Sequence, residues 1–511
     1  MLYAKVNSAA LAGMDSFPVQ VETDLSDGLP HVEMVGTLST EAREARERVR
    51  TALKNSGIRI PPKKITVSLS PADRRKEGSG FDLAMAAGIA AAMGMISDRV
   101  LRDCMIVGEV CLDGRVRGVR GVLAIAGCAR REGIRRLFVP RENAGEGAVF
   151  ADLEIMGVGS VKELLSILRG ENAGVPEPGC VWSESLPESG EDFSQVGGQE
   201  AVKRAAEVAC AGMHNMLMIG SAGAGKSMIA RRIPTILPRL TRQESIEIST
   251  IYSIGGCLTE GGGLIRSRPF RSPHHTITAA GLAGGGRIPR PGEISFAHGG
   301  VLFLDELPEF RASVLETLRQ PMEERRLTIV RAGVAYEFPA DFMLVAAMNP
   351  CRCGYYPDRS LCRCTEREVR DYLGKLSRPL MDRIDICSEV GKVSYDCLRE
   401  RGESSADIRA RVERAAAIQS RRFAGTSIRF NSRIPAGQLY RYCNVSAEAE
   451  TLLQKVYDRR TVTARGLHSL IRVARTIADL DESSAVEKRH VSEAVFYRGP
   501  REIFRGGEEN V

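Results

Sequence analysis

The sequence lacks any hydrophobic run long enough to cross a lipid bilayer. Its longest apolar stretch, residues 83–96, holds about 14 residues, whereas a membrane-spanning helix needs roughly 20. We therefore expect a buried helix there and no membrane partner. A secretion signal is also missing, because Asp15 and Glu22 follow the short N-terminal run of small residues. These absences predict a cytoplasmic protein whose 13 cysteines are thiols or metal ligands rather than disulfides.

The sequence also has little charge of one sign, no internal repeat and no low-complexity tract. Its 71 Lys and Arg against 64 Asp and Glu give a net charge of +7, which permits contact with nucleic acid without requiring it. Hydrophobic residues make up 43% and charged residues 26%, the balance of a globular protein. A chain of 511 residues is too long for one ordinary core, so we expect two or three domains.

Composition and patterning divide the chain into four parts. Residues 1–170 alternate short apolar runs with helix-like stretches, and residues 171–191 read as an exposed linker rich in Pro, Gly, Ser and Glu. Residues 192–393 show apolar strands that lead into glycine turns and helices, the pattern of an α/β domain. Strand signals fade in residues 394–511, which we expect to form a small helical domain.

The strongest motif is a glycine-rich loop that matches the pattern G-x-x-x-x-G-K-[ST]. It consists of Gly220, Ser221, Ala222, Gly223, Ala224, Gly225, Lys226 and Ser227. An apolar strand at 216–219 precedes it, and a helix can follow, which is the context that this phosphate-binding loop requires. Glycines let backbone N–H groups turn toward the phosphates. We expect Lys226 to reach the β- and γ-phosphates of ATP, and Ser227 to ligate Mg²⁺.

Two further apolar stretches end in polar side chains. Residues 301–304 lead into Asp305 and Glu306, a pair suited to holding the Mg²⁺ shell and to orienting or deprotonating the attacking water. Alone, such an end is often a solvated turn, but its distance from the glycine-rich loop favours the functional interpretation. Residues 342–348 lead into Asn349, whose amide can contact the γ-phosphate or the water, or can cap the turn before the following proline.

Four cysteines are concentrated in one short polar loop, at Cys351, Cys353, Cys362 and Cys364. Four thiolates can surround Zn²⁺ tetrahedrally, and a loop this polar has no apolar core of its own. The C-x-C spacing is less usual than C-x₂-C, so a free-thiol loop and a redox-regulated loop remain alternatives. Because the loop begins two residues after Asn349, loss of a metal is expected to disturb the ATP site.

The glycine-rich loop and the two other strand ends, in this order, resemble an AAA+ module. Six segments narrow the resemblance: 268–276 (RPFRSPHHT), 291–294 (PGEI), 302–309 (LFLDELPE), 348–350 (MNP), 379–385 (PLMDRID) and 464–467 (ARGL). Residues 29–36, 48–57 and 76–82 carry the match in the N-terminal part. Together these segments resemble the ComM/YifB family of magnesium-chelatase-like AAA+ ATPases over nearly the whole chain.

The resemblance implies a fold and an assembly. The fold is α/β: a P-loop AAA+ core is preceded by an α+β domain like the proteolytic domain of Lon (ribosomal S5 domain 2-like) and followed by a helical lid. Arg383 matches the arginine finger that reaches the ATP of a neighbouring subunit, and Arg465 matches the second sensor arginine of the lid. Both roles require a ring, which the resemblance implies is a homo-hexamer with ATP and Mg²⁺ as its cofactors. A guanidinium supplied across an interface can stabilise charge on a transferring phosphoryl group.

The resemblance also bears on proteolysis and on DNA. Lon uses a serine–lysine pair, but those positions fall on Gly80 and Leu123, which leaves no nucleophile pair; a one-residue slip would restore Ser79. We therefore expect an inactive scaffold domain. Residues 324–336 read as a β-hairpin turning at Ala332 and Gly333. Related motors aim such a hairpin into the ring pore.

Three arginines belong to this hairpin segment: Arg325, Arg326 and Arg331. They can grip DNA phosphates, although arginines on a hairpin are more often a solvated edge. We therefore expect a hexameric ATPase that moves on branched or single-stranded DNA, as in helicase or branch-migration activity during recombination or natural transformation. Its rivals are an ATPase that remodels a partner protein, as magnesium chelatase or chaperones do, and an ATP-dependent protease.

Overall fold

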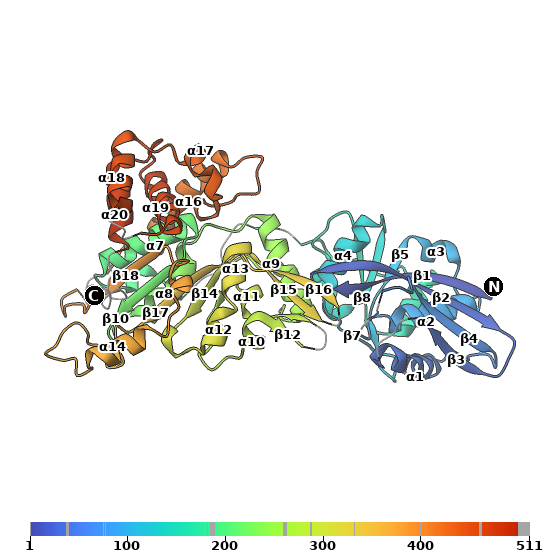
Figure 1. Cartoon of the computed structure of the whole chain (residues 1–511). Helices are drawn as coiled ribbons and strands as arrows, with labels where there is room; N and C mark the ends of the chain where they lie inside the picture. The colour runs from blue at the N-terminus through green and yellow to red at the C-terminus, as the bar shows by residue number, and fades with distance from the viewer. Residues whose placement is uncertain are drawn as a thin grey trace.

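The computed structural model of the chain describes residues 2–36, 40–74, 76, 78–180, 182–183, 190–258, 263–286, 289–331, 333–397, 401–458 and 462–498. In Figure 1 the N-terminal region lies at one end of an elongated molecule, and a parallel sheet with a group of helices lies toward the other. Three predicted features fall wholly or partly outside the described residues: the linker at 171–191, Ala332 in the hairpin turn and the end of the helical region after residue 498.

The N-terminal region is built on a mixed seven-stranded sheet in the order β3-β4-β2-β1-β5-β8-β9. Its strands are β1 (Tyr3–Ala12), β2 (Asp15–Ser26), β3 (His31–Val35), β4 (Lys64–Ser70), β5 (Cys104–Ile106), β8 (Arg136–Pro140) and β9 (Glu154–Val158). The long pair β1–β2 is antiparallel, whereas β5, β8 and β9 run parallel. A small hairpin, β6 (Glu109–Val110) with β7 (Val116–Arg117), stands apart from this sheet.

Among the described residues, six α-helices accompany this sheet. They are α1 (Thr40–Asn55), α2 (Asp82–Ala92), α3 (Asp98–Arg102), α4 (Val122–Arg131), α5 (Ala144–Gly147) and α6 (Val161–Leu168). Every residue of α2 is buried, which confirms the predicted internal helix in the longest apolar stretch. Close packing explains its small side chains: a Cβ at Gly88 would lie 2.7 Å from the Thr23 hydroxyl on β2.

The central region is a parallel five-stranded sheet in the order β11-β14-β17-β10-β18. Its strands are β10 (Met216–Gly220), β11 (Phe270–Arg271), β14 (Val301–Leu304), β17 (Met343–Met348) and β18 (Ile386–Val390). Strands β14 and β17 are buried throughout, which accounts for their continuous apolar sequences. Because β14, β17 and β10 are parallel neighbours, their three polar carboxyl ends gather at one edge of the sheet.

Helices and short hairpins surround this sheet. The helices are α7 (Glu200–Gly212), α8 (Lys226–Ile236), α9 (Arg242–Gly255), α10 (Ala279–Ala283), α11 (Glu293–Phe296), α12 (Ala312–Glu316), α13 (Arg319–Glu324), α14 (Glu366–Leu373) and α15 (Arg378–Met381). The hairpins are β12 (Gly284–Gly285) with β13 (Arg290–Pro291), and β15 (Arg326–Arg331) with β16 (Val334–Pro339). The second hairpin extends from the sheet toward the N-terminal region (Figure 1). There the aromatic ring of Tyr336 lies 3.3 Å from where a Cβ on Gly13 would stand.

The C-terminal region is helical, as the sequence predicts. Its helices are α16 (Ser405–Arg422), α17 (Leu439–Cys443), α18 (Ala447–Asp458), α19 (Ala464–Leu480) and α20 (Lys488–Phe496). Side chains fix two of the helix starts, because Ser404 and Thr463 accept from backbone N–H groups of the first turns of α16 and α19. Helices α16 and α19 both pack on α7 of the central region.

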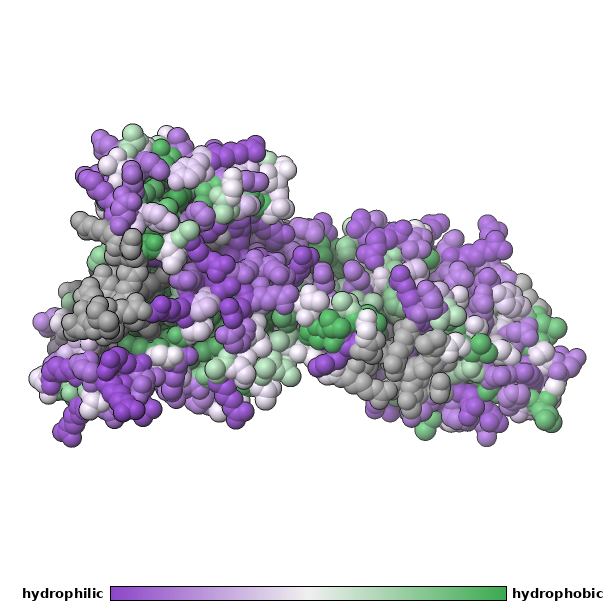
Figure 2. Space-filling model, in the orientation of Figure 1, coloured by the Kyte–Doolittle hydropathy of each residue, from purple (hydrophilic) through white to green (hydrophobic). Residues whose placement is uncertain are grey.

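No helix among the described residues is long and apolar enough to cross a membrane. The face drawn in Figure 2 is predominantly hydrophilic, and the hydrophobic residues visible on it form small separate areas. Both observations agree with the absence of a long apolar run in the sequence.

Candidate active site

The glycine-rich loop joins β10 to α8 in a conformation that only glycine readily adopts. Gly223 and Gly225 have φ angles of 78° and 94°, in the left-handed region. At Gly220 a Cβ would stand 2.3 Å from the carbonyl oxygen of Val390 on the neighbouring strand β18. These glycines let the backbone turn tightly at the start of α8, where free N–H groups and the helix dipole favour an anion.

Lys226 and Asn349 meet at the carboxyl edge of the sheet. The ammonium group of Lys226 donates to the carbonyl oxygens of Gly220 (2.7 Å) and Ser221 (2.8 Å), and to Oδ1 of Asn349 (3.0 Å). Burial lowers the pKa of Lys226, while the carboxylates of Asp305 and Glu306 act in the opposite direction. The lysine is thus held among oxygen atoms that anionic phosphate oxygens can replace.

Ser227 and Asp305 form the second pair. The Ser227 hydroxyl donates to Oδ2 of Asp305 over 2.6 Å, which brings the first turn of α8 against the end of β14. A hydroxyl and a carboxylate are oxygen ligands of the kind that Mg²⁺ prefers, so this pair fits the ion that accompanies ATP. The sequence predicted both residues, and the geometry places their oxygen atoms together.

Glu306 differs from Asp305 in its surroundings. Its φ of 52° is left-handed, which turns its side chain, 59% exposed, away from the buried end of β14. Nδ1 of His275 lies 3.5 Å from its carboxylate, and the His275 ring stands 4.1 Å from that of His274. The sequence gives no reason to pair His275 with Glu306, since the two residues lie on segments that only the fold brings together.

An open cavity of about 380 Å³ lies next to these groups. It is lined by Glu306, Glu309, Asn349, Arg352, Tyr372 and Lys375. Glu306 and Asn349, the candidate water-activating and phosphate-sensing residues, therefore share one space. Arg352 and Lys375 add two cations to its wall that the sequence analysis did not single out.

Arg383 and Arg465 both contact one acidic residue, Glu323. Nη2 of Arg383 lies 2.7 Å from Oε1 of Glu323, and Nη2 of Arg465 also donates to that oxygen. The hydrogen bonds of the described residues connect neither arginine with the glycine-rich loop of its own chain. The structure thus brings the two predicted arginines together at Glu323.

The four cysteines converge. Their sulfur atoms all lie within 4.8 Å of one another, with Sγ–Sγ distances of 3.3 Å for Cys351–Cys353, 3.5 Å for Cys353–Cys362 and 3.8 Å for Cys351–Cys362. Tetrahedral Zn–S bonds of about 2.3 Å separate sulfur atoms by roughly 3.8 Å, so the set fits a zinc ion.

The cysteine loop also touches the glycine-rich loop. A Cβ on Gly354, which has a φ of 83°, would stand 3.4 Å from the backbone nitrogen of Ala222 and 3.8 Å from Cα of Ser221. The same position lies 4.0 Å from Cγ of Asn349. The path of the cysteine loop therefore bears directly on the phosphate-binding backbone and on Asn349.

The hairpin β15–β16 separates the three arginines that the sequence grouped together. Arg331 pairs with Val334 at the end of the hairpin and is exposed, and Arg326 lies at its base with a side chain 58% exposed. Arg325 precedes β15, and its left-handed φ of 59° turns it inward. It does not share the exposed surface of the hairpin.

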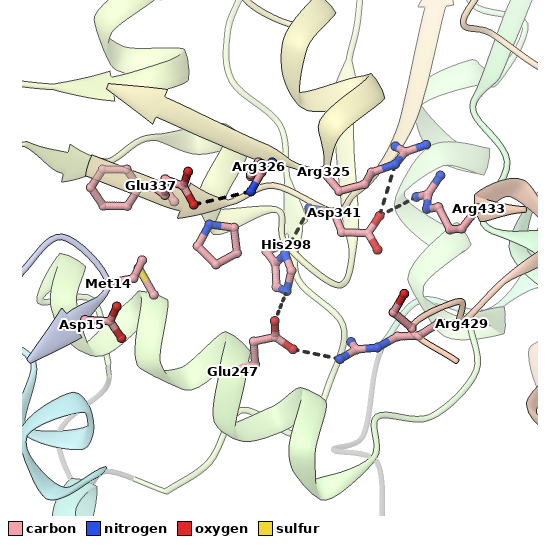
Figure 3. A pocket seen from close by; sticks show the side chains of 13 residues that line it. Met14, Asp15, Glu247, His298, Arg325, Arg326, Glu337, Asp341, Arg429 and Arg433 are labelled. Atoms are coloured by element: carbon pink, nitrogen blue, oxygen red, sulfur yellow. Dashed lines mark hydrogen bonds and ion pairs between the residues drawn. The ribbon is translucent and has the colours of Figure 1, made fainter. Parts of the chain in front are cut away.

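Arg325 belongs to a polar network between the central and C-terminal regions (Figure 3). Its guanidinium and that of Arg433 both face Asp341, with N–O distances of 3.9 and 2.7 Å. Burial, with Arg433 nearby, lowers the pKa of Arg325 to about 9. These ion pairs give Arg325 a structural setting that the sequence did not indicate.

This network borders a second cavity, of about 500 Å³, which Met14 and Asp15 of the N-terminal region also line. On its other wall, Glu247 of α9 faces His298 at 3.4 Å and Arg429 at 3.2 Å (Figure 3). All three regions of the chain therefore meet at this place.

The N-terminal positions compared with Lon have other partners. Leu123 is buried in a small hydrophobic cluster with Val149 and with Leu264 of the central region. The Ser79 hydroxyl donates to the Glu109 carboxylate. The position expected to carry the catalytic lysine is therefore used for packing between the two regions.

Comparison with known proteins supports this arrangement along the chain. Residues 192–398 match the family model of magnesium chelatase, subunit ChlI. Residues 21–143 match the model of subunit ChlI of Mg-chelatase, and residues 402–498 match that of the C-terminal part of this subunit.

Full-length relatives give a narrower comparison. The uncharacterized protein YifB of Escherichia coli is 38% identical over 504 residues, which cover 96% of each chain. The competence protein ComM of Haemophilus influenzae is 37% identical over 504 residues, 98% of each chain. The DNA replication licensing factor Mcm6 of Drosophila melanogaster is 28% identical over 224 residues, 40% of this chain and 25% of that protein. The chain therefore belongs to the ComM and YifB family of magnesium-chelatase-like AAA+ ATPases.

Proposed function

We propose that the chain hydrolyses ATP at the carboxyl edge of the five-stranded sheet. The observation that carries this proposal is the meeting of three strand ends, in which Lys226 bonds to Asn349 and Ser227 bonds to Asp305. Chance would not bring a phosphate-binding loop, a metal-binding carboxylate and a polar sensor to one edge. Together they match the needs of phosphoryl transfer, which depends on positioning and on charge stabilisation.

Each residue has a defined task. The backbone of the glycine-rich loop and Lys226 bind the phosphates, and Ser227 with Asp305 holds the magnesium ion. Bound Mg²⁺ supplies positive charge against the phosphate oxygens. Glu306 accepts a proton from the attacking water or orients it, and Asn349 directs its amide to the γ-phosphate or the same water.

Arg383 and Arg465 complete the site of a neighbouring subunit. Both are held close together at one acidic residue, and no hydrogen bond among the described residues joins either of them to the glycine-rich loop of its own chain. A ring, most simply a homo-hexamer, gives each nucleotide such a pair from the next subunit. Guanidinium groups then stabilise the charge that develops during transfer.

The four-cysteine cluster holds Zn²⁺ as a structural ion. Four sulfur atoms at these separations match a closed tetrahedral site, which leaves no position for a reactant. The contact of Gly354 with Ala222 lets this ion fix the loop beside the phosphates.

The ATPase acts on DNA, as a helicase or branch-migration motor in recombination or natural transformation. Three observations support this assignment: one relative is a DNA replication licensing factor, another is a competence protein, and exposed arginines stand at both ends of β15. The matches to magnesium chelatase models favour a second candidate, an ATPase that remodels a partner protein. Proteolysis is the least supported, because Leu123 stands buried where a catalytic lysine is required.

One experiment separates these candidates. ATP turnover of the purified wild type is measured alone and with single-stranded, double-stranded and branched DNA, beside the Lys226→Ala variant. We expect DNA to stimulate ATP turnover by the wild type, and we expect the Lys226→Ala variant to show no turnover. Turnover unchanged in Lys226→Ala would refute the ATP site, and DNA-independent turnover with no DNA binding would favour the remodelling ATPase.

A further inference from the structure

Glu323 is a shared partner of the two arginines assigned to the neighbouring nucleotide. It lies near the end of α13, whereas Arg383 follows α15 and Arg465 stands in the first turn of α19. The two arginines come from separate parts of the fold, and the same carboxylate oxygen of Glu323 contacts both. This convergence is a property of the fold and cannot arise from proximity along the chain.

The chemistry requires a carboxylate at this place. Two guanidinium groups side by side repel each other, and a carboxylate has enough lone pairs to accept from both. The side chain of Arg383 is only 10% exposed, and burial lowers its pKa, while the charge of Glu323 opposes that effect. Arg319 adds further positive charge nearby, and its own ion pair is with Glu316 at 2.6 Å.

We propose that Glu323 is a positioning residue that holds Arg383 and Arg465 side by side, so that both guanidinium groups reach the triphosphate bound by a neighbouring copy of this chain. This inference rests on the proposed ATPase ring. Glu323 itself touches no nucleotide and acts through the two arginines. Without the negative charge of Glu323, the two arginines separate, and their guanidinium groups no longer lie where charge develops on the phosphoryl group.

The place of Glu323 in the chain also connects the arginines with the hairpin. Arg325, two residues later, faces Asp341, and β15 begins at the next residue, Arg326. A shift of Glu323 as the arginines bind phosphate therefore passes to the base of the hairpin. The contact thus links nucleotide binding to the element proposed to meet DNA.

Steady-state ATP hydrolysis by Glu323→Gln tests the positioning role. The variant keeps the shape of the side chain and removes its charge. We expect kcat to fall about tenfold or more, because small displacements of a catalytic group are costly, whereas KM changes less than about twofold. Glu316→Gln is the matched control, since it removes an equal charge on the same surface from a pair that involves neither arginine. Wild-type kcat in Glu323→Gln would overturn the inference.

Mixed rings distinguish positioning across the interface from a structural effect within the subunit. Glu306→Gln subunits cannot activate water themselves, but they carry an intact Glu323 and both arginines. In an equal mixture, half of the Glu323→Gln sites receive an intact neighbour, so turnover per Glu323→Gln subunit should rise about fivefold over that variant alone.

Arg383→Ala, mixed in the same way with Glu306→Gln, tests the ring itself. If mixing restores turnover to Arg383→Ala but not to Glu323→Gln, the role of Glu323 is structural. The inference about Glu323 then fails, while the proposed ATPase ring stands. If mixing restores neither, the proposed action across subunits fails, and the inference fails with it. Restoration of both variants is the expected result.

Discussion

Replacing Cys353 and Cys364 with serine together is the most informative test of the cysteine cluster. These two residues are half-buried, whereas Cys351 and Cys362 are buried in the hydrophobic core that also contains Met348 of β17. The double variant therefore removes two of the four proposed zinc ligands while it leaves the packed pair in place. We expect it to lose zinc and to remain folded.

The size of the effect on catalysis follows from the loop that the ion closes. A covalent cross-link that closes a loop of about 15 residues, close to the span from Cys351 to Cys364, stabilises a protein by roughly 3 kcal/mol, and we take this value as the most that the ion contributes to holding the loop. If all of this 3 kcal/mol were added to the activation free energy, the rate would fall about a hundredfold. Because the two buried cysteines still pack in the core, the loop keeps part of its conformation without the ion. We therefore expect kcat to fall between about tenfold and a hundredfold. The cysteine loop affects the ATP site through Gly354, which packs on Ala222 and Asn349.

Elemental analysis and ATP turnover on the same preparation provide the measurement. The wild type should carry about one zinc ion per chain, and the double variant none. Cys257→Ser, at an exposed cysteine outside the cluster, controls for the loss of a thiol. A wild type without metal would refute the zinc site. A metal-free double variant with wild-type kcat would refute the link to the phosphate loop.

Three other variants test separate parts of the molecule. Glu306→Gln should bind ATP and assemble normally but turn over at least about a hundredfold more slowly, and normal turnover would assign water activation elsewhere. Joint replacement of Arg326 and Arg331 with alanine should weaken DNA binding equally across sequences and reduce the salt slope by about 2; an unchanged slope would exclude the hairpin as the contact. His298 and Arg429 hold the pKa of Glu247 at about 2, below its usual 4.5. The ionised carboxylate therefore stabilises the folded protein fully above pH 4.5, and this contribution is lost as the pH falls toward 2. In urea, Glu247→Gln should be less stable than wild type by about 1–2 kcal/mol at pH 7. The expected loss is this small because the side chain is a third exposed, so that solvent screens its ion pairs. A stability difference that stays constant down to pH 3 would contradict this prediction.

The sequence predicted those features that short segments encode completely. The glycine-rich loop specifies its own conformation, because left-handed φ angles at Gly223 and Gly225 need glycine. Apolar runs that end in a polar residue located the strand ends at Asp305 and Asn349. Since parallel strands end at one edge of a sheet, their meeting with Lys226 followed from the fold class.

Contacts between distant segments could not be predicted in this way. Grouping Arg325 with Arg326 assumed that adjacent residues share one surface, but the left-handed backbone at Arg325 turns its side chain toward Asp341. The second partner of Asp341, Arg433, lies about 90 residues further along the chain, and no local pattern marks it. The pairing of Glu323 with two arginines was missed for the same reason.

The end of α13 and the two residues after it bring three of these features together within positions 323–326. Glu323 contacts the arginines assigned to the neighbouring nucleotide, Arg325 faces Asp341 beside the C-terminal region, and Arg326 begins the hairpin. The backbone of Arg325 connects the helix end with the hairpin: its N–H donates to the carbonyl oxygen of Pro321 in α13 (3.0 Å), and its carbonyl oxygen accepts from the N–H of Ala340, just after β16 (2.9 Å). If the arginines bind phosphate as proposed, we expect a displacement of Glu323 to move the base of the hairpin as well. A motor needs such a rigid connection between the place where ATP is hydrolysed and the surface that meets its substrate.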